Sequence, residues 1–321
     1  MTIRLNDSAA VLVQQLLEKS AELEITHSQL DNGVTIIDLG ISVSGSLAAG
    51  ISLAEICIAG QGHVTMVPLT SNLPTAHVVT IKSSHPLAAC MASQYAGWKI
   101  ATDDFFGMGS GPMRAAAGSE EIYQHIGCIE SASHVVGVIE SSSIPTTAAC
   151  ELIIAACQIE PQNLTLLVAP TSSLAGTVQI VARSLETAMH KMHELGFDLH
   201  RVERGTGTAP LCPLGQDDLL SIGLTNDAIL YGGEVEIWVR GDDSSLNDIG
   251  PKIPSNASTD YGRPFVDIFR QYNNDFYKID PHLFSPATIR INNVDTGNTF
   301  CFGEINSAVL IESFNSAPLS D

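Results

Sequence analysis

Residues 163–196, NLTLLVAPTSSLAGTVQIVARSLETAMHKMHELG, constrain the fold more than any other stretch of this chain. The short apolar run 164–169 predicts a buried strand. The hydroxyl residues at 171–173 are typical of a helix start, and Gly196 is typical of the residue just past a helix end. We therefore predict a strand, a turn and one long helix that ends at Gly196.

Strand and helix patterns alternate along most of the 321 residues, which is typical of an α/β or mixed α+β protein with layered helices. The length indicates more than one domain. We expect an N-terminal α/β domain over 1–143 and a C-terminal α/β domain over 144–321 that carries the long helix. Chain crossings would make either domain discontinuous. Other expected elements are a first helix capped by Asp7 or Ser8, strands at 76–82 and 134–140, helices at 85–100 and 264–277, a glycine loop and a helix within 103–127, a helix then a strand within 217–239, and a final short apolar segment AVLIESF.

Composition excludes several classes of protein. The net charge is −20, with 35 acids against 15 bases, so the chain lacks the cationic surface that nucleic acids and anionic membranes attract. No apolar run is long enough to span a membrane, and the first twenty residues lack the features of a signal peptide. The seven cysteines are scattered and form no C-x-x-C pair, which is typical of small buried side chains in a reducing cytoplasm.

One face of the predicted long helix gathers polar side chains. Arg183 and Glu186 are three residues apart and share a face, and His190 and His193 follow at helical spacing. Spacing alone leaves three interpretations open: a solvated face, a catalytic face or a metal site. The order H-E-x-x-H of helical zinc sites is absent.

Three further places carry candidate site residues. In the run 107–114, G-M-G-S-G-P-M-R, the residues Gly109, Ser110 and Gly111 put flexible backbone before a helix start, and Arg114 adds a positive charge; the run is either a tight turn or a cradle for an anion. Thr171 and Ser172 either cap a helix or contact a ligand. Asn226 and Asp227 either line a cleft or build a turn, and spacing does not decide between these.

Five runs together resemble methenyltetrahydromethanopterin cyclohydrolase. They keep the family's order and cover about two thirds of the chain, although residues 241–321 carry little of the resemblance. The runs are NGVTIIDLG (32–40), HPLAACMASQYAGW (85–98), FGMGSGPMRA (106–115), LTLLVAPTSSLAGTVQIVARSLETAMHKMHE (164–194) and TNDAILYGGEV (225–235).

The resemblance implies an enzyme of one-carbon metabolism, found where methane is made or formaldehyde is oxidised. It would interconvert 5,10-methenyltetrahydromethanopterin plus water with 5-formyltetrahydromethanopterin. It further implies a cytoplasmic homotrimer without metal or prosthetic group, whose subunit has two domains flanking a wide cleft.

The chemistry implied by the resemblance favours a carboxylate over a metal. The methenyl substrate is an amidinium cation, so a divalent metal would repel it, whereas a carboxylate can stabilise it and move protons. Under this interpretation Glu186 is the general base and then the general acid, and Arg183 holds it in place. His190 and the residues named above at 109–114, 171–172 and 226–227 become candidate substrate contacts.

Two alternatives belong to other classes. A metal-dependent amidohydrolase would use Glu186, His190 and His193 as ligands. A non-catalytic relative would bind the pterin without turnover, and the presence of both Arg183 and Glu186 argues weakly against it.

Overall fold

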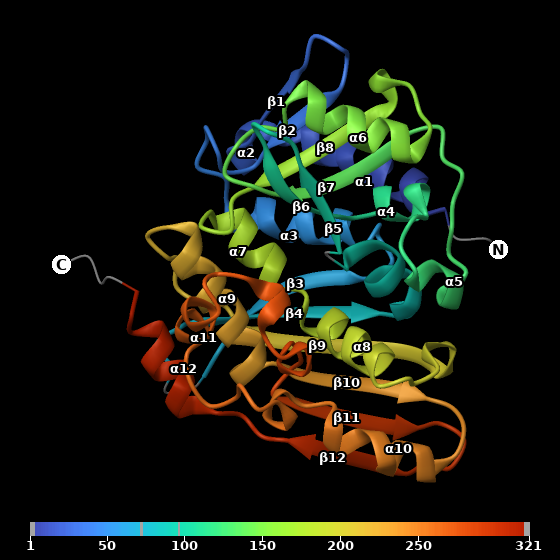
Figure 1. Cartoon of the computed structure of the whole chain (residues 1–321), viewed down its shortest axis with the longest axis vertical. Helices are drawn as coiled ribbons and strands as arrows, with labels where there is room; N and C mark the ends of the chain where they lie inside the picture. The colour runs from blue at the N-terminus through green and yellow to red at the C-terminus, as the bar shows by residue number, and fades with distance from the viewer. Residues whose placement is uncertain (1–3, 71–72, 96, 318–321) are drawn as a thin grey trace. The chain divides into compact units, whose positions relative to one another are not determined.

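The chain divides into two compact units, each built from two separated stretches. The structure, a computed structural model, describes residues 4–70, 73–95 and 97–317. The first unit takes residues 1–63 and 87–179, and the second takes 64–86 and 180–321 (Figure 1). Each unit holds one six-stranded mixed sheet, so the predicted mixed α/β class is confirmed. The boundary expected at 143/144 falls inside the first unit.

The sheet of the first unit has three parallel strands at its centre. The strand order is β1-β2-β8-β7-β6-β5. Strands β2, β8 and β7 run parallel, while β1, β6 and β5 pair antiparallel with their neighbours. The bounds are β1 Thr26–Gln29, β2 Thr35–Asp38, β5 Trp98–Ala101, β6 Phe106–Ser110, β7 Val135–Glu140 and β8 Leu164–Ala169.

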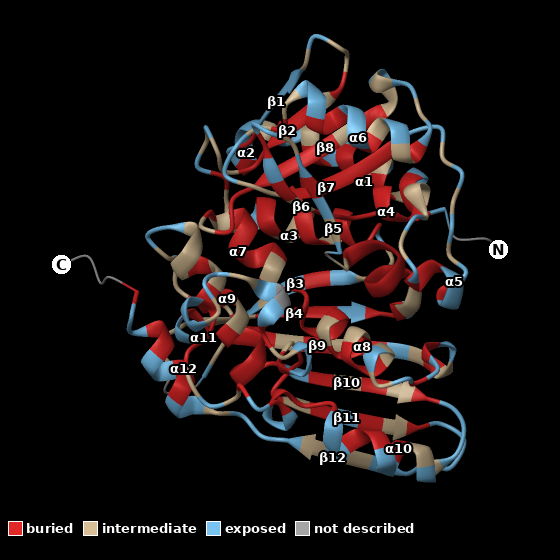
Figure 2. Ribbon diagram, viewed as in Figure 1, coloured by how far each residue is buried: buried red, intermediate tan, exposed pale blue. Residues whose placement is uncertain are grey.

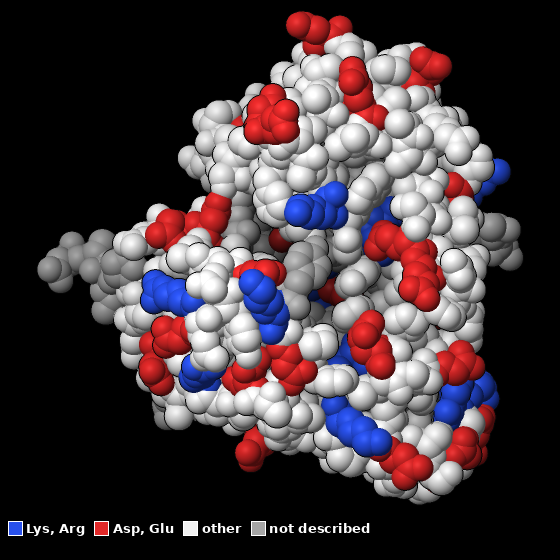
Figure 3. Space-filling view, viewed as in Figure 1, with Lys and Arg blue, Asp and Glu red and all other residues white. Residues whose placement is uncertain are grey.

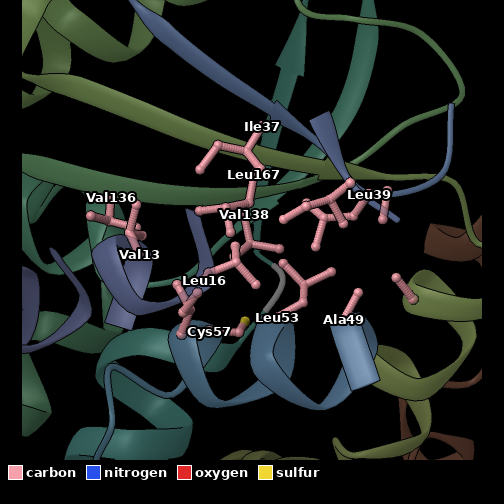
Figure 4. Packing of buried hydrophobic residues seen from close by; sticks show 14 of the residues in the cluster. Val13, Leu16, Ile37, Leu39, Ala49, Leu53, Cys57, Val136, Val138 and Leu167 are labelled. Carbon is pink, nitrogen blue, oxygen red and sulfur yellow. The ribbon is translucent and has the colours of Figure 1, made fainter. Parts of the chain in front are cut away.

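Helices cover both faces of this sheet because its central strands are apolar on both sides. On one face α1 (Leu5–Glu18) and α3 (Leu47–Cys57) pack against β2, β7 and β8, as the cluster in Figure 4 shows. On the other face α6 (Thr147–Cys157) and Met113 of α4 (Met113–Ala117) pack against the same strands. The core of the unit therefore lies on both sides of the central strands, which are buried along their length (Figure 2).

The sheet of the second unit is mostly antiparallel. Its order is β12-β11-β10-β9-β4-β3, and β10 and β11 alone among the registered pairs run parallel. A long crossover joins these two strands and contains α10 (Asp243–Ile249) and α11 (Phe265–Gln271). The strand bounds are β3 His63–Pro68, β4 His77–Ser83, β9 Val202–Pro210, β10 Glu234–Val239, β11 Thr288–Asn293 and β12 Thr299–Gly303.

Two helical layers accompany this second sheet. Helix α8 (Ser184–Glu194) packs on β9 and β10, and α9 (Asp218–Gly232) contacts both α11 and α12 (Ser307–Phe314). The remaining helical segments of the chain are α2 Ser20–Leu23, η1 Leu87–Gln94, α5 Ile122–Ile126, η2 Pro161–Asn163, α7 Leu174–Val181, η3 Leu199–Arg201, η4 Gly250–Lys252, η5 Ser255–Ala257, η6 Phe276–Lys278 and η7 Pro281–Leu283.

The single long helix predicted up to Gly196 is wrong. Helix α7 ends at Val181 and α8 begins at Ser184, with a turn between them in which the Arg183 amide donates to the Ile180 carbonyl at 3.0 Å. Neither turn residue is a helix breaker, so the local sequence gives no sign of the interruption. The chain passes from the first unit to the second between residues 179 and 180.

The helix predicted over 85–100 is shorter and wider than expected. Residues Leu87–Gln94 form a π-helix, and Ala96 lies outside the described residues. The carbonyls of Met91, Ala92 and Ser93 accept hydrogen bonds from Arg114, Tyr123 and the Gly111 amide, respectively. Donors outside the helix therefore stabilise a turn that regular α-helical bonding would not produce.

Other boundaries also differ from the sequence-based expectations. The glycine run 106–110 is strand β6, and two short helices, α4 and α5, follow it because Gly118 takes a left-handed conformation (φ +56°). Helix α11 stops at Gln271 because Asn273 and Asn274 have positive φ.

The cap expected for the first helix, Asp7 or Ser8, is wrong. The first helix begins at Leu5, with Arg4 as N-cap and Asp7 inside its first turn. The final apolar segment is helix α12, capped by Asn306.

The charges on the surface agree with the acidic composition of the chain. Acidic side chains are spread over the face shown in Figure 3, with fewer Lys and Arg among them. Within the part of the chain that the structure describes, no helix combines the length and hydropathy needed to cross a bilayer.

Candidate active site

The second unit contains a buried ion pair at the start of α8. Arg183 is the N-cap residue and Glu186 lies in the first turn. The Arg183 Nε donates to Glu186 Oε2 at 3.1 Å, and the two residues are only 6% and 4% exposed. The positive Arg183 and the negative Glu186 are thus paired away from bulk water on one short helix. Their spacing predicts that they share a helix face.

An apolar stripe holds this helix on its sheet. Leu185, Ala188, Met189 and Met192 are fully buried, and α8 packs on β9 and β10. Glu186 lies at the N-terminal end of the helix, where the helix dipole favours a negative charge. The chain leaves the helix through Gly196, which has φ +78°, as its position past a helix end predicts. The fold thus fixes the orientation of the ion pair through the helix that carries it.

The two histidines of α8 do not join the ion pair into a metal site. His190 Nε2 lies 3.6 Å from Glu194 Oε1. Among the described residues, no group of three or more His, Cys, Asp or Glu side chains has a geometry suited to a metal ion. The set of Glu186, His190 and His193 proposed for an amidohydrolase therefore receives no support from the geometry.

Lys191 is a buried cation that the sequence analysis missed. Its side chain lies among the buried residues of α8, and its Nζ donates to the His282 carbonyl at 2.6 Å. Burial lowers the pKa of Lys191 to about 8, although the negative charge of Asp280 raises it. Lys191 therefore ties α8 to η7 of the crossover. In the sequence, the only signal of this buried cation was that a lysine interrupts the apolar residues of the helix.

Arg114, in the first unit, has partners within the protein. Its side chain is fully buried, with Nε 2.8 Å from Glu120 Oε1 and Nη2 2.7 Å from Glu120 Oε2. Its Nη1 donates to the Met91 carbonyl, and its guanidinium lies over the rings of Tyr95 and Tyr123. Its charge is therefore balanced inside the unit, where it supports the end of the π-helix.

The glycine run next to Arg114 is packed against its surroundings. Gly109 pairs with Trp98 on β5 and with Ile139 on β7. Ser110 is fully buried, with its Oγ 3.4 Å from Cys57 Sγ. Gly111 has φ +87°, a conformation that glycine adopts without strain. The role of these residues in substrate binding remains a prediction.

The turn after β8 contains the helix cap and the two candidate residues Thr171 and Ser172 at different positions. Ser173 Oγ accepts from the Gly176 amide at 3.0 Å, so Ser173 is the residue that caps α7. Thr171 is buried, and its carbonyl accepts from Thr177 Oγ1; Ser172 is half-buried. The cap is thus assigned to Ser173, and Thr171 and Ser172 stay candidate ligand contacts.

Asn226 and Asp227 lie on α9, and both have partners within the second unit. Asn226 Nδ2 donates to the carbonyl of Ile222 in its own helix. Asp227 is fully buried and accepts from Ser313 Oγ at 2.6 Å and from the Phe265 amide at 2.8 Å. Burial raises the pKa of Asp227 to about 8. Asp227 thus joins α9 to α11 and α12.

A buried carboxylate held by a guanidinium on a rigid helix is an arrangement that enzymes use to move protons. The chain belongs to the cyclohydrolase family MCH, whose model matches residues 4–314. The resemblance found in the sequence is thereby confirmed.

Curated relatives named methenyltetrahydromethanopterin cyclohydrolase match the chain along nearly its whole length. The protein of Methylobacillus flagellatus is 44% identical over 303 residues, covering 94% of this chain and 93% of its own. That of Xanthobacter autotrophicus is 43% identical, covering 97% of this chain and 93% of its own. That of Methanococcoides burtonii is 40% identical, covering 97% and 98%.

Proposed function

We propose that this chain is an enzyme that interconverts 5,10-methenyltetrahydromethanopterin plus water with 5-formyltetrahydromethanopterin, using Glu186 and Arg183. Membership of the cyclohydrolase family and the names of the relatives support the reaction. The observation that supports these two residues is the buried contact between Arg183 Nε and Glu186 Oε2 on α8.

The substrate explains why a carboxylate is suited to this reaction. The methenyl carbon joins two nitrogens that share one positive charge, and a negatively charged side chain stabilises this cation when it binds. Water adds to the carbon and gives one proton to Glu186, which leaves a neutral adduct with a hydroxyl on the former methenyl carbon. Because positive charge disappears in this step, no oxyanion has to be stabilised.

The second half of the reaction returns the proton. The bond between carbon and N10 breaks, N10 takes the proton from Glu186, and the hydroxyl oxygen becomes the formyl oxygen on N5 as its own proton leaves. One proton is released overall in the direction of hydrolysis. Glu186 therefore acts first as general base and then as general acid.

Arg183 has the task of holding Glu186. The guanidinium fixes one carboxylate oxygen, so the other oxygen is available to a water molecule or to N10. The pairing also keeps Glu186 from swinging away when its charge is lost. Arg183 is therefore proposed as the residue that orients Glu186. The candidate substrate contacts are His190, Gly109, Ser110, Gly111, Arg114, Thr171, Ser172, Asn226 and Asp227.

Other properties of the enzyme are proposed from the family resemblance alone. They are a homotrimeric assembly, a cytoplasmic location, and catalysis without metal or prosthetic group. Light scattering of the purified protein tests the assembly, and a mass other than three subunits would contradict it.

The experiment that tests the function follows the amidinium absorbance during hydrolysis. Wild type should hydrolyse the methenyltetrahydromethanopterin substrate faster than methenyltetrahydrofolate. Glu186→Gln keeps the shape of the side chain and should lower kcat by ~10²–10⁴ while substrate still binds. Unchanged turnover by Glu186→Gln would remove Glu186 from the mechanism, and binding without any turnover by wild type would indicate a non-catalytic pterin-binding protein.

A further inference from the structure

Strand β9 contacts the catalytic helix at two glycines. Gly205 and Gly207 are separated by one residue on β9, so they lie on the same face of the sheet, and both are buried. Helix α8 packs against this strand. The sequence R-G-T-G-T at 204–208 therefore presents two positions without side chains to α8.

Gly207 contacts the two residues that lie between Arg183 and Glu186 in the chain. A Cβ at Gly207 would lie 2.5 Å from Ser184 Oγ and 2.8 Å from the Leu185 backbone nitrogen. Ser184 and Leu185 are the two residues between Arg183 and Glu186 in the chain. The close approach of β9 to α8 at Gly207 therefore occurs at the helical turn that carries Arg183 and Glu186.

The neighbouring glycine makes a different contact. A Cβ at Gly205 would lie 2.6 Å from Leu185 Cδ1 and 3.0 Å from Cδ2, which are the far end of a side chain. Leucine can move its methyl groups by changing rotamer, whereas the Leu185 backbone nitrogen can move only with the helix. A methyl group at Gly205 would therefore displace only the end of a side chain, whereas one at Gly207 would displace the backbone of α8.

We propose that Gly207 is a positioning residue for the Arg183–Glu186 pair: the absence of a side chain there lets the first turn of α8 lie at the depth on β9 that the reaction requires. The inference rests on the proposed function of Glu186. A methyl group at Gly207 moves the first turn outward and takes the Glu186 carboxylate with it. A displacement of about 1 Å at a catalytic group is enough to lower a rate by ~10²-fold.

The test compares Gly207→Ala with the matched control Gly205→Ala. Gly207→Ala should lower kcat by ~10–100-fold while KM changes by less than about threefold, because the error in position affects the reacting groups and not the bulk of the substrate contacts. Gly205→Ala should keep kcat within about twofold of wild type. Equal activity of the two variants, or an equal loss of activity in both, would overturn the inference.

A second pair of variants changes the same contact from the helix. Ser184→Thr adds a methyl group opposite Gly207 and should lower kcat in the same way. Ser184→Ala removes a hydroxyl that has no hydrogen-bond partner among the described residues and should leave kcat unchanged. These variants decide the matter if Gly207→Ala does not fold; full activity of Ser184→Thr would then overturn the inference.

Failure of this inference and failure of the proposed function are distinguishable. Glu186→Gln tests the function alone, because it leaves the contact between α8 and β9 untouched. If Glu186→Gln is inactive and Gly207→Ala is fully active, the function stands and the positioning role of Gly207 is lost. If Glu186→Gln is fully active, the proposed mechanism fails before Gly207 is considered.

Discussion

Glu120 holds the fully buried guanidinium of Arg114 through both of its carboxylate oxygens, at 2.8 Å and 2.7 Å. The pair lies beside the π-helix Leu87–Gln94, whose Met91 carbonyl accepts a third hydrogen bond from Arg114. This network gives Arg114 a structural role that does not require a ligand.

Loss of the Glu120 carboxylate should therefore destabilise the protein. In Glu120→Gln the arginine stays buried without its counter-charge, and the free energy of unfolding should fall by about 3 kcal/mol. Urea unfolding followed by circular dichroism measures it. A variant of unchanged stability that binds the pterin substrate much more weakly would instead support Arg114 as a substrate contact.

Replacing Arg183 by lysine tests what the guanidinium contributes beyond its charge. Lysine keeps the positive charge but cannot reproduce the planar Nε contact that orients Glu186. We expect Arg183→Lys to lower kcat by about tenfold or more with a smaller change in KM. Steady-state kinetics on the methenyl substrate check this, and wild-type kcat in Arg183→Lys would show that charge alone suffices.

The buried carboxyl of Asp227 should make stability depend on pH. Its folded pKa, about 8, is raised from the usual 3.8 by burial, so the folded state holds a proton that the unfolded state releases. This group therefore contributes stability that is present below about pH 4 and is lost as the pH rises to about 8. Asp227→Asn should remove this decline and be more stable than wild type near pH 8.

Urea unfolding at pH 5 and pH 8 measures the effect. The exposed Asp103 provides the control, because Asp103→Asn should leave the difference between the two pH values as in wild type. A decline with pH that is as steep in Asp227→Asn as in wild type would contradict the prediction.

Lys191 should have an effect of opposite sign at higher pH. Burial lowers its folded pKa to about 8 from 10.5, so between these values the unfolded state binds more protons than the folded state. Stability from this group therefore rises as the pH increases from about 8 to 10.5. Wild type should gain stability relative to Lys191→Met over this range.

Thermal unfolding between pH 7.5 and 10 checks this prediction. Lys252 is exposed, and Lys252→Met is the matched control that should follow wild type. If the difference between wild type and Lys191→Met stays constant with pH, the lowered pKa of Lys191 is wrong.

The sequence was informative where local patterns and tertiary structure agree. The apolar run 164–169 is strand β8 with the expected bounds, and Gly196 ends its helix in the left-handed conformation. Arg183 and Glu186 were placed on one helix face from their spacing, and they form an ion pair there. Each of these features depends on residues close together in the chain.

The parts that could not be predicted depend on contacts between distant residues. Nothing in Ala182 or Arg183 marks the interruption between α7 and α8, and the wide turn at Leu87–Gln94 depends on donors that lie some twenty or more residues further along. From the sequence, Arg114 was a candidate anion contact beside a glycine run, and Asp227 was a residue of either a cleft or a turn. Their partners Glu120 and Ser313 became evident only in the fold.

The sheet order of the second unit has a consequence for synthesis on the ribosome. Strands β3 and β4 are complete by Ser83, but β9, which pairs with β4, does not begin until Val202, after the chain has made the whole of the first unit. The nascent chain thus carries an open strand edge of β4 while the first unit is being made and folded. Expression at lower temperature or with holding chaperones should therefore increase the yield of native protein more than it does for a chain whose strands pair in the order in which they are made.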